Sequence, residues 1–137
     1  MTGLVEKNKL TTDTFDWGIM KWLTTPDQND GAGFSVGELV IFPGKGHDRH
    51  NHEGSDELLF FLSGEGMQTV DDGEPFVVKA GDAVYLSDGM YHSTQNTGWD
   101  PIRLLAIYCP GGPEKDFKTL PDYQGLPAGI IQKLIRG

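Results

Sequence analysis

The sequence predicts an all-β domain built as a sandwich or a barrel. Its ordered-looking segments are short, rich in β-branched and aromatic residues, and separated at close intervals by glycine, proline or aspartate. No convincing helix intervenes between them, which favours a sandwich or a barrel over a parallel α/β sheet. At 137 residues the chain is long enough for one core and needs no second domain.

The first two strands are expected on either side of a polar loop. FDWGIMKWL at 15–23 and FSVGELVIF at 34–42 are short and rich in β-branched and aromatic residues, which is typical of strands. TTPDQNDGAG at 24–33 combines proline, glycine and aspartate, which is typical of a loop.

A hairpin is expected in the middle of the chain. ELLFFLSG at 57–64 precedes it, and GMQTV at 66–70 and FVVK at 76–79 form its two arms. DDG at 71–73 lies between the arms, where aspartate and glycine tolerate the positive φ of a tight turn. Three further strands follow at 83–87, 92–97 and 102–109.

The two ends of the chain differ from the middle. We expect a single domain over 1–137, with a core at about 34–110, an N-terminal arm at 1–33 and a tail at 111–137. PGGPEKDFKTLPDYQGLPAG at 110–129 holds too many prolines and glycines for a strand or a long helix. IIQKLIR at 130–136 is the one stretch whose apolar pattern predicts a short helix.

Composition excludes several classes of function. Twenty acidic against 11 basic residues give a net charge of −9, which opposes binding to nucleic acid and to acidic membranes. No apolar run reaches the roughly 20 residues of a membrane-spanning helix, and the N-terminus lacks the apolar core of a signal peptide. The single cysteine, Cys109, cannot form an internal disulfide, and we expect it to be a small buried hydrophobe. These features predict a cytoplasmic protein.

Histidines gather in GKGHDRHNHEGSDELLFFLSGEG at 44–66, which holds three of the four in the chain. His50 and His52 lie two residues apart, so on an extended segment both side chains leave from one face and can share an ion. Glu57 follows at the start of an apolar run, where a carboxylate is costly to bury without a cation. His92 begins a distant strand and would complete the set if that strand lay alongside.

These residues resemble the cupin family. Its first motif matches through Gly44, His50, His52, Glu57 and Gly64, with glycine, five residues, HxH, four residues, glutamate, six residues and glycine in order. Its second motif matches through Gly81, Gly89, His92 and Asn96, and Ser87 stands where the family pattern has a proline.

The resemblance implies a double-stranded β-helix, or jelly-roll barrel, with a divalent metal held by His50, His52, Glu57 and His92. Imidazole and carboxylate ligands together suit Fe, Mn, Ni, Co, Cu or Zn, and four protein ligands leave two positions of an octahedral ion open. His47 falls outside the motif spacing and is interpreted as a loop residue. Asp56 should point away from Glu57, towards solvent or a loop.

The function expected from this site is that of a small metal-dependent enzyme. Its substrate would be a small chelating molecule with carboxylate or hydroxy-carbonyl groups, and a dioxygenase is the first interpretation. An oxygen-independent isomerase, lyase or decarboxylase of a sugar or organic acid is the alternative. A third hypothesis is a module that binds a small ligand or a metal without transforming it.

The alternation of side chains along a strand predicts which residues of 57–64 face the core and which face outward. If Glu57 points inward, Leu59 and Phe61 do so too, which leaves three apolar side chains outside: Leu58, Phe60 and Leu62. Such a face needs a cover, and a homodimer is the first interpretation. The candidate substrate contacts are Arg103, Tyr85, Tyr108 and Gln95, and Arg103 could hold an anionic ligand with its guanidinium group.

Overall fold

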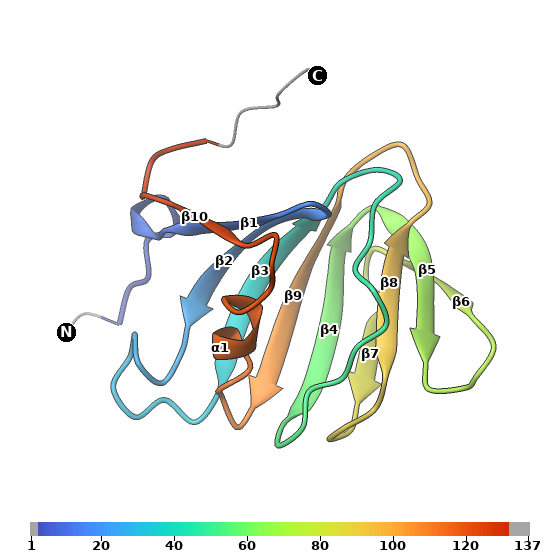
Figure 1. Ribbon diagram of the computed structural model, residues 1–137, viewed down its shortest axis with the longest axis horizontal. Helices are drawn as coiled ribbons and strands as arrows, with labels where there is room; N and C mark the ends of the chain where they lie inside the picture. The colour runs from blue at the N-terminus through green and yellow to red at the C-terminus, as the bar shows by residue number, and fades with distance from the viewer. Residues whose placement is uncertain (1–2, 132–137) are drawn as a thin grey trace.

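The structure is a computed structural model that describes residues 3–131, and it is built almost entirely of antiparallel strands (Figure 1). The strands in chain order are β1 Thr12–Phe15, β2 Gly18–Thr24, β3 Ser35–Ile41, β4 Asp56–Ser63, β5 Glu65–Val70, β6 Phe76–Lys79, β7 Ala83–Leu86, β8 His92–Asn96, β9 Ile102–Cys109 and β10 Gln124–Leu126. A 3-10 turn, η1, covers Lys7–Lys9, and one short helix, α1, covers Glu114–Phe117.

The strands form two sheets whose inner faces enclose the core. The larger sheet has seven strands in the order β10-β1-β2-β3-β9-β4-β7, and the smaller has three in the order β6-β5-β8. Some neighbouring strands are far apart in sequence, because β9 lies between β3 and β4 and β10 pairs with β1. This crossing pattern is that of a jelly-roll barrel, which confirms the predicted fold class.

The predicted strands from 34 to 109 agree with β3 to β9 within a residue or two. Asp71, in the turn between β5 and β6, has a φ of +47°, and the two strands pair as the predicted hairpin. The strand predicted at 15–23 is wrong in one respect, because the chain turns back at Asp16 and Trp17 and makes two strands, β1 and β2. The aromatic residues on either side of that turn hide it in the sequence.

The tail contains regular structure that its composition did not predict. β10 pairs with β1 and forms one edge of the larger sheet, with Thr12 opposite Leu126. Thr14 adds a hydrogen bond from its hydroxyl to the carbonyl of Gln124, at 3.0 Å. A three-residue edge strand tolerates flanking prolines, so the prediction of no strand in this region is corrected. The short helix predicted over 130–136 falls almost wholly on 132–137, outside the described residues.

Alternation along β4 divides it between the core and the outside, as predicted. Leu59 and Phe61 are buried, whereas Leu58, Phe60 and Leu62 remain 36%, 36% and 41% exposed. Cys109 is also exposed, which contradicts the expected burial, because β9 alternates and buries Tyr108 instead.

The loop between β3 and β4 extends the smaller sheet and so positions the site. It runs along β8 (Figure 1), where Gly46 bridges Gln95 and His50 bridges His92. A side chain at residue 46 would collide with Gln95 and with the backbone of Thr94, so glycine allows this close approach. No helix among residues 3–131 is long and apolar enough to cross a membrane.

Candidate metal centre

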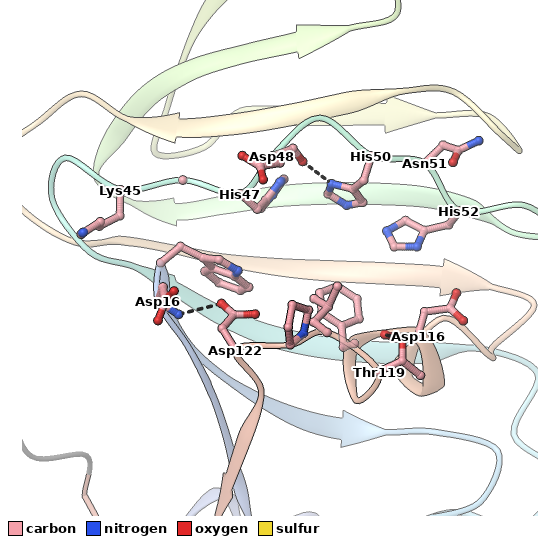
Figure 2. A pocket seen from close by; sticks show the side chains of 15 residues that line it. Asp16, Lys45, His47, Asp48, His50, Asn51, His52, Asp116, Thr119 and Asp122 are labelled. Carbon is pink, nitrogen blue, oxygen red and sulfur yellow. Dashed lines mark hydrogen bonds between the residues drawn. The ribbon is translucent and has the colours of Figure 1, made fainter.

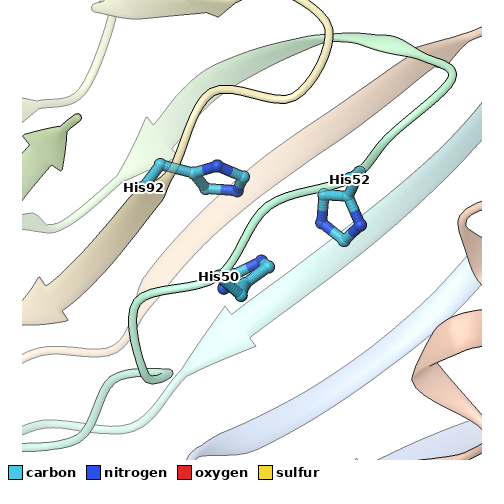
Figure 3. Close-up of side chains that lie close together, drawn as sticks. All are labelled: His50, His52 and His92. Carbon is cyan, nitrogen blue, oxygen red and sulfur yellow. The ribbon is translucent and has the colours of Figure 1, made fainter.

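Three histidines converge between the loop and the smaller sheet (Figure 3). His50 and His52 come from the loop, and His92 is the first residue of β8. One ring nitrogen from each lies within 4.8 Å of those of the other two, a spacing at which a single ion could contact all three. The backbone pairing of His50 with His92, through two hydrogen bonds of 3.0 and 2.8 Å, fixes this arrangement.

Backbone contacts select the tautomer of two of these rings. Nδ1 of His50 lies 2.8 Å from the carbonyl oxygen of Asp48, and Nδ1 of His92 lies 3.0 Å from that of Met90. A carbonyl can only accept, so each Nδ1 carries the proton and donates it. The Nε2 atoms are thereby left with free lone pairs, as metal-binding histidines require.

The buried polar atoms beside these rings lack protein partners. His52 is 8% exposed and Glu57 4% exposed, yet neither ring nitrogen of His52 nor Oε1 of Glu57 has a hydrogen-bond partner within residues 3–131. Oε1 of Glu57 lies 3.2 Å from Nε2 of His92 and 3.8 Å from Nε2 of His52. Unpartnered polar atoms are costly in a protein interior, and a shared cation would bind Oε1 of Glu57 and one ring nitrogen of His52 at once. The donor set therefore fits a divalent transition metal.

Burial and charge set the protonation of the three rings differently. Burial lowers the pKa of His52 to about 4, although Glu57 opposes the shift, and burial also lowers the pKa of His50. Burial acts in the same direction on His92, but the contact with the Glu57 carboxylate outweighs it and raises the pKa of His92. Most of the cluster is therefore neutral near pH 7, which is the form that binds metals.

Tyr108 is the one predicted substrate contact that the structure places beside the histidines. It lies opposite Glu57 in the pairing of β4 with β9, and its ring centre is 5.2 Å from that of His52. The Tyr108 side chain is fully buried, and burial together with the Glu57 charge raises the pKa of its hydroxyl well above the usual value. Tyr108 is thus a neutral hydrogen-bond donor next to Glu57.

The other three predicted contacts lie away from the cluster. Arg103 points to the outer face of the larger sheet and forms an ion pair with Glu38. Tyr85 is 61% exposed on β7. Gln95 is exposed on β8, and its amide donates a hydrogen bond of 3.3 Å to the carbonyl oxygen of His47. Asp56 is exposed and accepts a hydrogen bond from the backbone of Asp88, as its predicted orientation requires.

His47 lies closer to the cluster than its position outside the motif indicates. Its ring centre is 4.5 Å from that of His50 and 6.2 Å from that of His92, and its Nδ1 is buried without a partner in the described part of the chain. Burial, with the neighbouring histidines, holds the pKa of His47 well below its usual value. The irregular loop backbone turns this ring inward, and no sequence periodicity reports such a turn.

A pocket of about 790 Å³ opens onto the histidines (Figure 2). The loop forms one wall, which includes His47, His50 and His52, and the C-terminal segment at 116–122 forms the other. Phe117 joins the two walls, because its ring stacks on that of His52 with centres 5.8 Å apart. The composition of the tail does not indicate that it lines the site.

Comparisons with known proteins agree with this geometry. The chain matches the family described as "Cupin domain" over residues 37–108. An uncharacterized protein of Methanocaldococcus jannaschii is 31% identical over 107 residues, which cover 78% of this chain and 85% of that protein. The oxalate-binding protein of Thermotoga maritima is 38% identical over 69 residues, but the match covers only 50% of this chain and 56% of that relative.

Solved structures show the same fold. A structure from Thermotoga maritima described as a predicted oxalate decarboxylase superimposes with a TM-score of 0.69 at 24% identity. The superposition covers 78% of this chain and 98% of that one. At this identity the likeness shows only that the two proteins share the barrel fold described above.

Proposed function

The chain belongs to the cupin domain family, and from that premise we propose that it holds one divalent transition metal and uses the ion to bind a small chelating organic molecule. The proposed ligands are His50, His52, Glu57 and His92. The observation that carries the proposal is the set of buried, unpartnered atoms on His52 and Glu57, which face the lone pair on Nε2 of His92. A bound ion would act as a Lewis acid towards the chelating groups and, if redox-active, towards O2.

The residues around the proposed metal have distinct roles. Tyr108 donates to or orients the Glu57 carboxylate from the opposite strand. Leu59 and Phe61 follow Glu57 along the inner face of β4 and belong to the buried apolar core, which would keep bulk water from that side of the ligands. Phe117 covers His52 from the side of the tail and so limits the space above the ligands.

The proposed reaction is an oxygen-dependent one, of the dioxygenase type. The apolar wall beneath the histidines supports it, because O2 enters apolar space readily and a reactive intermediate is shielded there from water. The alternative is a lyase, decarboxylase or isomerase that needs no oxygen, because an ion held by the same ligands could act as a Lewis acid alone. The relative named as an oxalate-binding protein supports a binding module without turnover.

We expect Fe(II)-loaded protein to consume O2 in the presence of at least one small hydroxy or keto acid. The measurement is an oxygen electrode combined with product analysis, and His52→Ala protein treated in the same way is the control. Turnover that is unchanged under strict anaerobiosis would assign the oxygen-independent reaction. Tight binding without product under any metal would assign the binding module, and no binding at all would contradict the proposed function.

A homodimer formed by the outer face of the larger sheet completes the proposal. Leu58, Phe60 and Leu62 on β4 are exposed, and Leu58 pairs with the exposed Tyr85 on β7. On the other side of β4, Phe60 pairs with the half-buried Leu105, so the apolar surface continues across neighbouring strands. A surface of this kind is typical of a contact between subunits.

We expect light scattering to give the mass of a dimer at micromolar concentration, and Phe60→Lys to give a monomer because the charge would be buried in the contact. Val77→Lys is the matched control, since Val77 is an exposed apolar residue on the smaller sheet, in β6. A monomeric wild-type protein would contradict the dimer.

A further inference from the structure

Four carboxylates line the pocket that leads to the histidines (Figure 2), and three of them are exposed to solvent, which places them at its mouth. They come from three separate parts of the chain and are called the acidic rim: Asp16 in the turn between β1 and β2, Asp48 in the loop, and Asp116 and Asp122 in the C-terminal segment. Lys45 is the one lysine or arginine among the described residues that line the pocket. The lining therefore carries a net negative charge.

Two arginines are engaged elsewhere, whereas Lys45 in the lining and Lys115 and Lys118 beside Asp116 in the sequence offset the charge of the rim only in part. Arg49 contacts Asp72, at 3.4 Å, and lies over the ring of Tyr91, while Arg103 pairs with Glu38 on the outer face. None of the four rim carboxylates takes part in an ion pair within the described range 3–131. The carboxylate of Asp122 accepts a hydrogen bond of 2.9 Å from the backbone of Asp16, which orders the rim but leaves its charge uncompensated.

The inner end of the pocket would carry the opposite charge once an ion is bound. His52 is buried, lines the pocket, and has two ring nitrogens without partners in the described structure, so it marks the inner end as the place where a bound group would lie. A divalent ion held there by three neutral imidazoles and one carboxylate would keep a net positive charge. A molecule that spans the pocket would then meet a positive centre at its inner end and carboxylates at the mouth.

We propose that this pocket selects a metal-chelating molecule whose far end carries an ammonium or another cationic group. The inference rests on the proposed metal site and names the substrate class of that site. The anionic, chelating end would bind the ion, and the cationic end would lie against Asp48, Asp116 and Asp122. A longer dianion with a second carboxylate at its far end is disfavoured, because the rim carboxylates repel that group.

The test compares three α-hydroxy acids that share the chelating end and a four-carbon chain. They are malate, 2-hydroxybutyrate and 4-amino-2-hydroxybutyrate, with anionic, neutral and cationic far ends. Binding to Mn(II)-loaded protein is measured by calorimetry and by water proton relaxation, without any need for turnover. We expect the amino compound to bind about tenfold more tightly than malate at low salt, with the difference shrinking as salt is added.

Variants assign the preference to the rim. Asp116→Asn and Asp122→Asn should each reduce the preference for the amino compound about threefold, and the new amide of the second can still accept from the Asp16 backbone. Asp30→Asn, on an exposed loop outside the pocket lining, is the matched control and should leave the preference unchanged.

The possible failures are distinguishable. Malate binding as tightly as the amino compound, or a preference that survives both rim substitutions, would overturn the inference and leave the metal site standing. No binding of any of the three acids to the loaded protein would overturn the proposed function itself, and the inference with it.

Discussion

His92→Ala protein is expected to lose its metal, with an affinity at least about 100-fold below that of the wild type. His92 is the one proposed ligand from the smaller sheet, and its Nε2 lies 3.2 Å from Oε1 of Glu57. Its removal takes away a donor and leaves the buried carboxylate without its nearest imidazole. Elemental analysis after dialysis against a weak chelator gives the metal content per chain.

The matched control for this substitution is Gln95→Ala. Gln95 lies on the same strand and is exposed, and its loss removes one hydrogen bond to the backbone of His47 but no proposed ligand, so it tests for damage to β8 and the loop. The control should keep its metal, and its unfolding temperature should rise with added metal as the wild type does, since an ion at 100 times its Kd stabilises the folded state by about 2.7 kcal/mol. A His92→Ala protein with unchanged metal content and an unchanged thermal response would contradict the site.

Strand periodicity explains why much of the barrel could be predicted from the sequence. A period of two is imposed by the backbone, so placing Glu57 inward also placed Leu59 and Phe61 correctly and exposed Leu58 and Phe60. The turn at Asp16 was missed because Phe15 and Trp17 continue the apolar pattern across it. Their rings stack inside the core with centres 4.9 Å apart. Both residues are therefore apolar because they pack in the core, although only Phe15 lies in a strand.

The same periodicity also limits which of the predicted substrate contacts on β9 can face the metal. Arg103 and Tyr108 are five residues apart on one strand and must face opposite sides, so only one could reach the metal. The structure assigns Tyr108 to the inside and Arg103 to the outer pair with Glu38. The sequence could not decide between them, because the choice depends on how β9 is aligned with β4.

The C-terminal wall could not be predicted, because nothing local encodes it. Phe117 is a single aromatic residue in a segment rich in proline and glycine, and its partners, Phe15 and Trp22, are about a hundred residues away. The buried hydrogen bond from Ser35 to Glu114, at 2.8 Å, also joins distant parts of the chain. These contacts depend on the position of β1 to β3 in the folded sheet, which the local sequence of the tail does not determine.

Phe117→Ala is expected to have the second largest effect, a loss of about 3 kcal/mol in the free energy that holds the C-terminal segment on the barrel. Phe117 is 7% exposed, and its ring contacts Phe15, Trp22 and His52 with centres 5.6 to 6.0 Å apart. An alanine leaves a cavity between the tail and the histidine wall. The segment would then open locally, while the strands of the barrel remain paired.

Hydrogen exchange separates this local opening from general unfolding. In Phe117→Ala, amides of α1 and β10 should exchange faster, whereas those of β4 and β9 should be little changed. Metal content should also be kept, since the proposed ligands lie on the loop, β4 and β8, but the affinity for a chelating acid should fall because one wall of the pocket is gone. Leu120→Ala is the control, because Leu120 lines the same pocket but is 41% exposed and fills no core space. Unchanged exchange in α1 and β10 would show that the Phe117 ring does not hold the C-terminal segment on the barrel. Ligand affinity equal to that of the wild type would show that this segment does not contribute to the binding site.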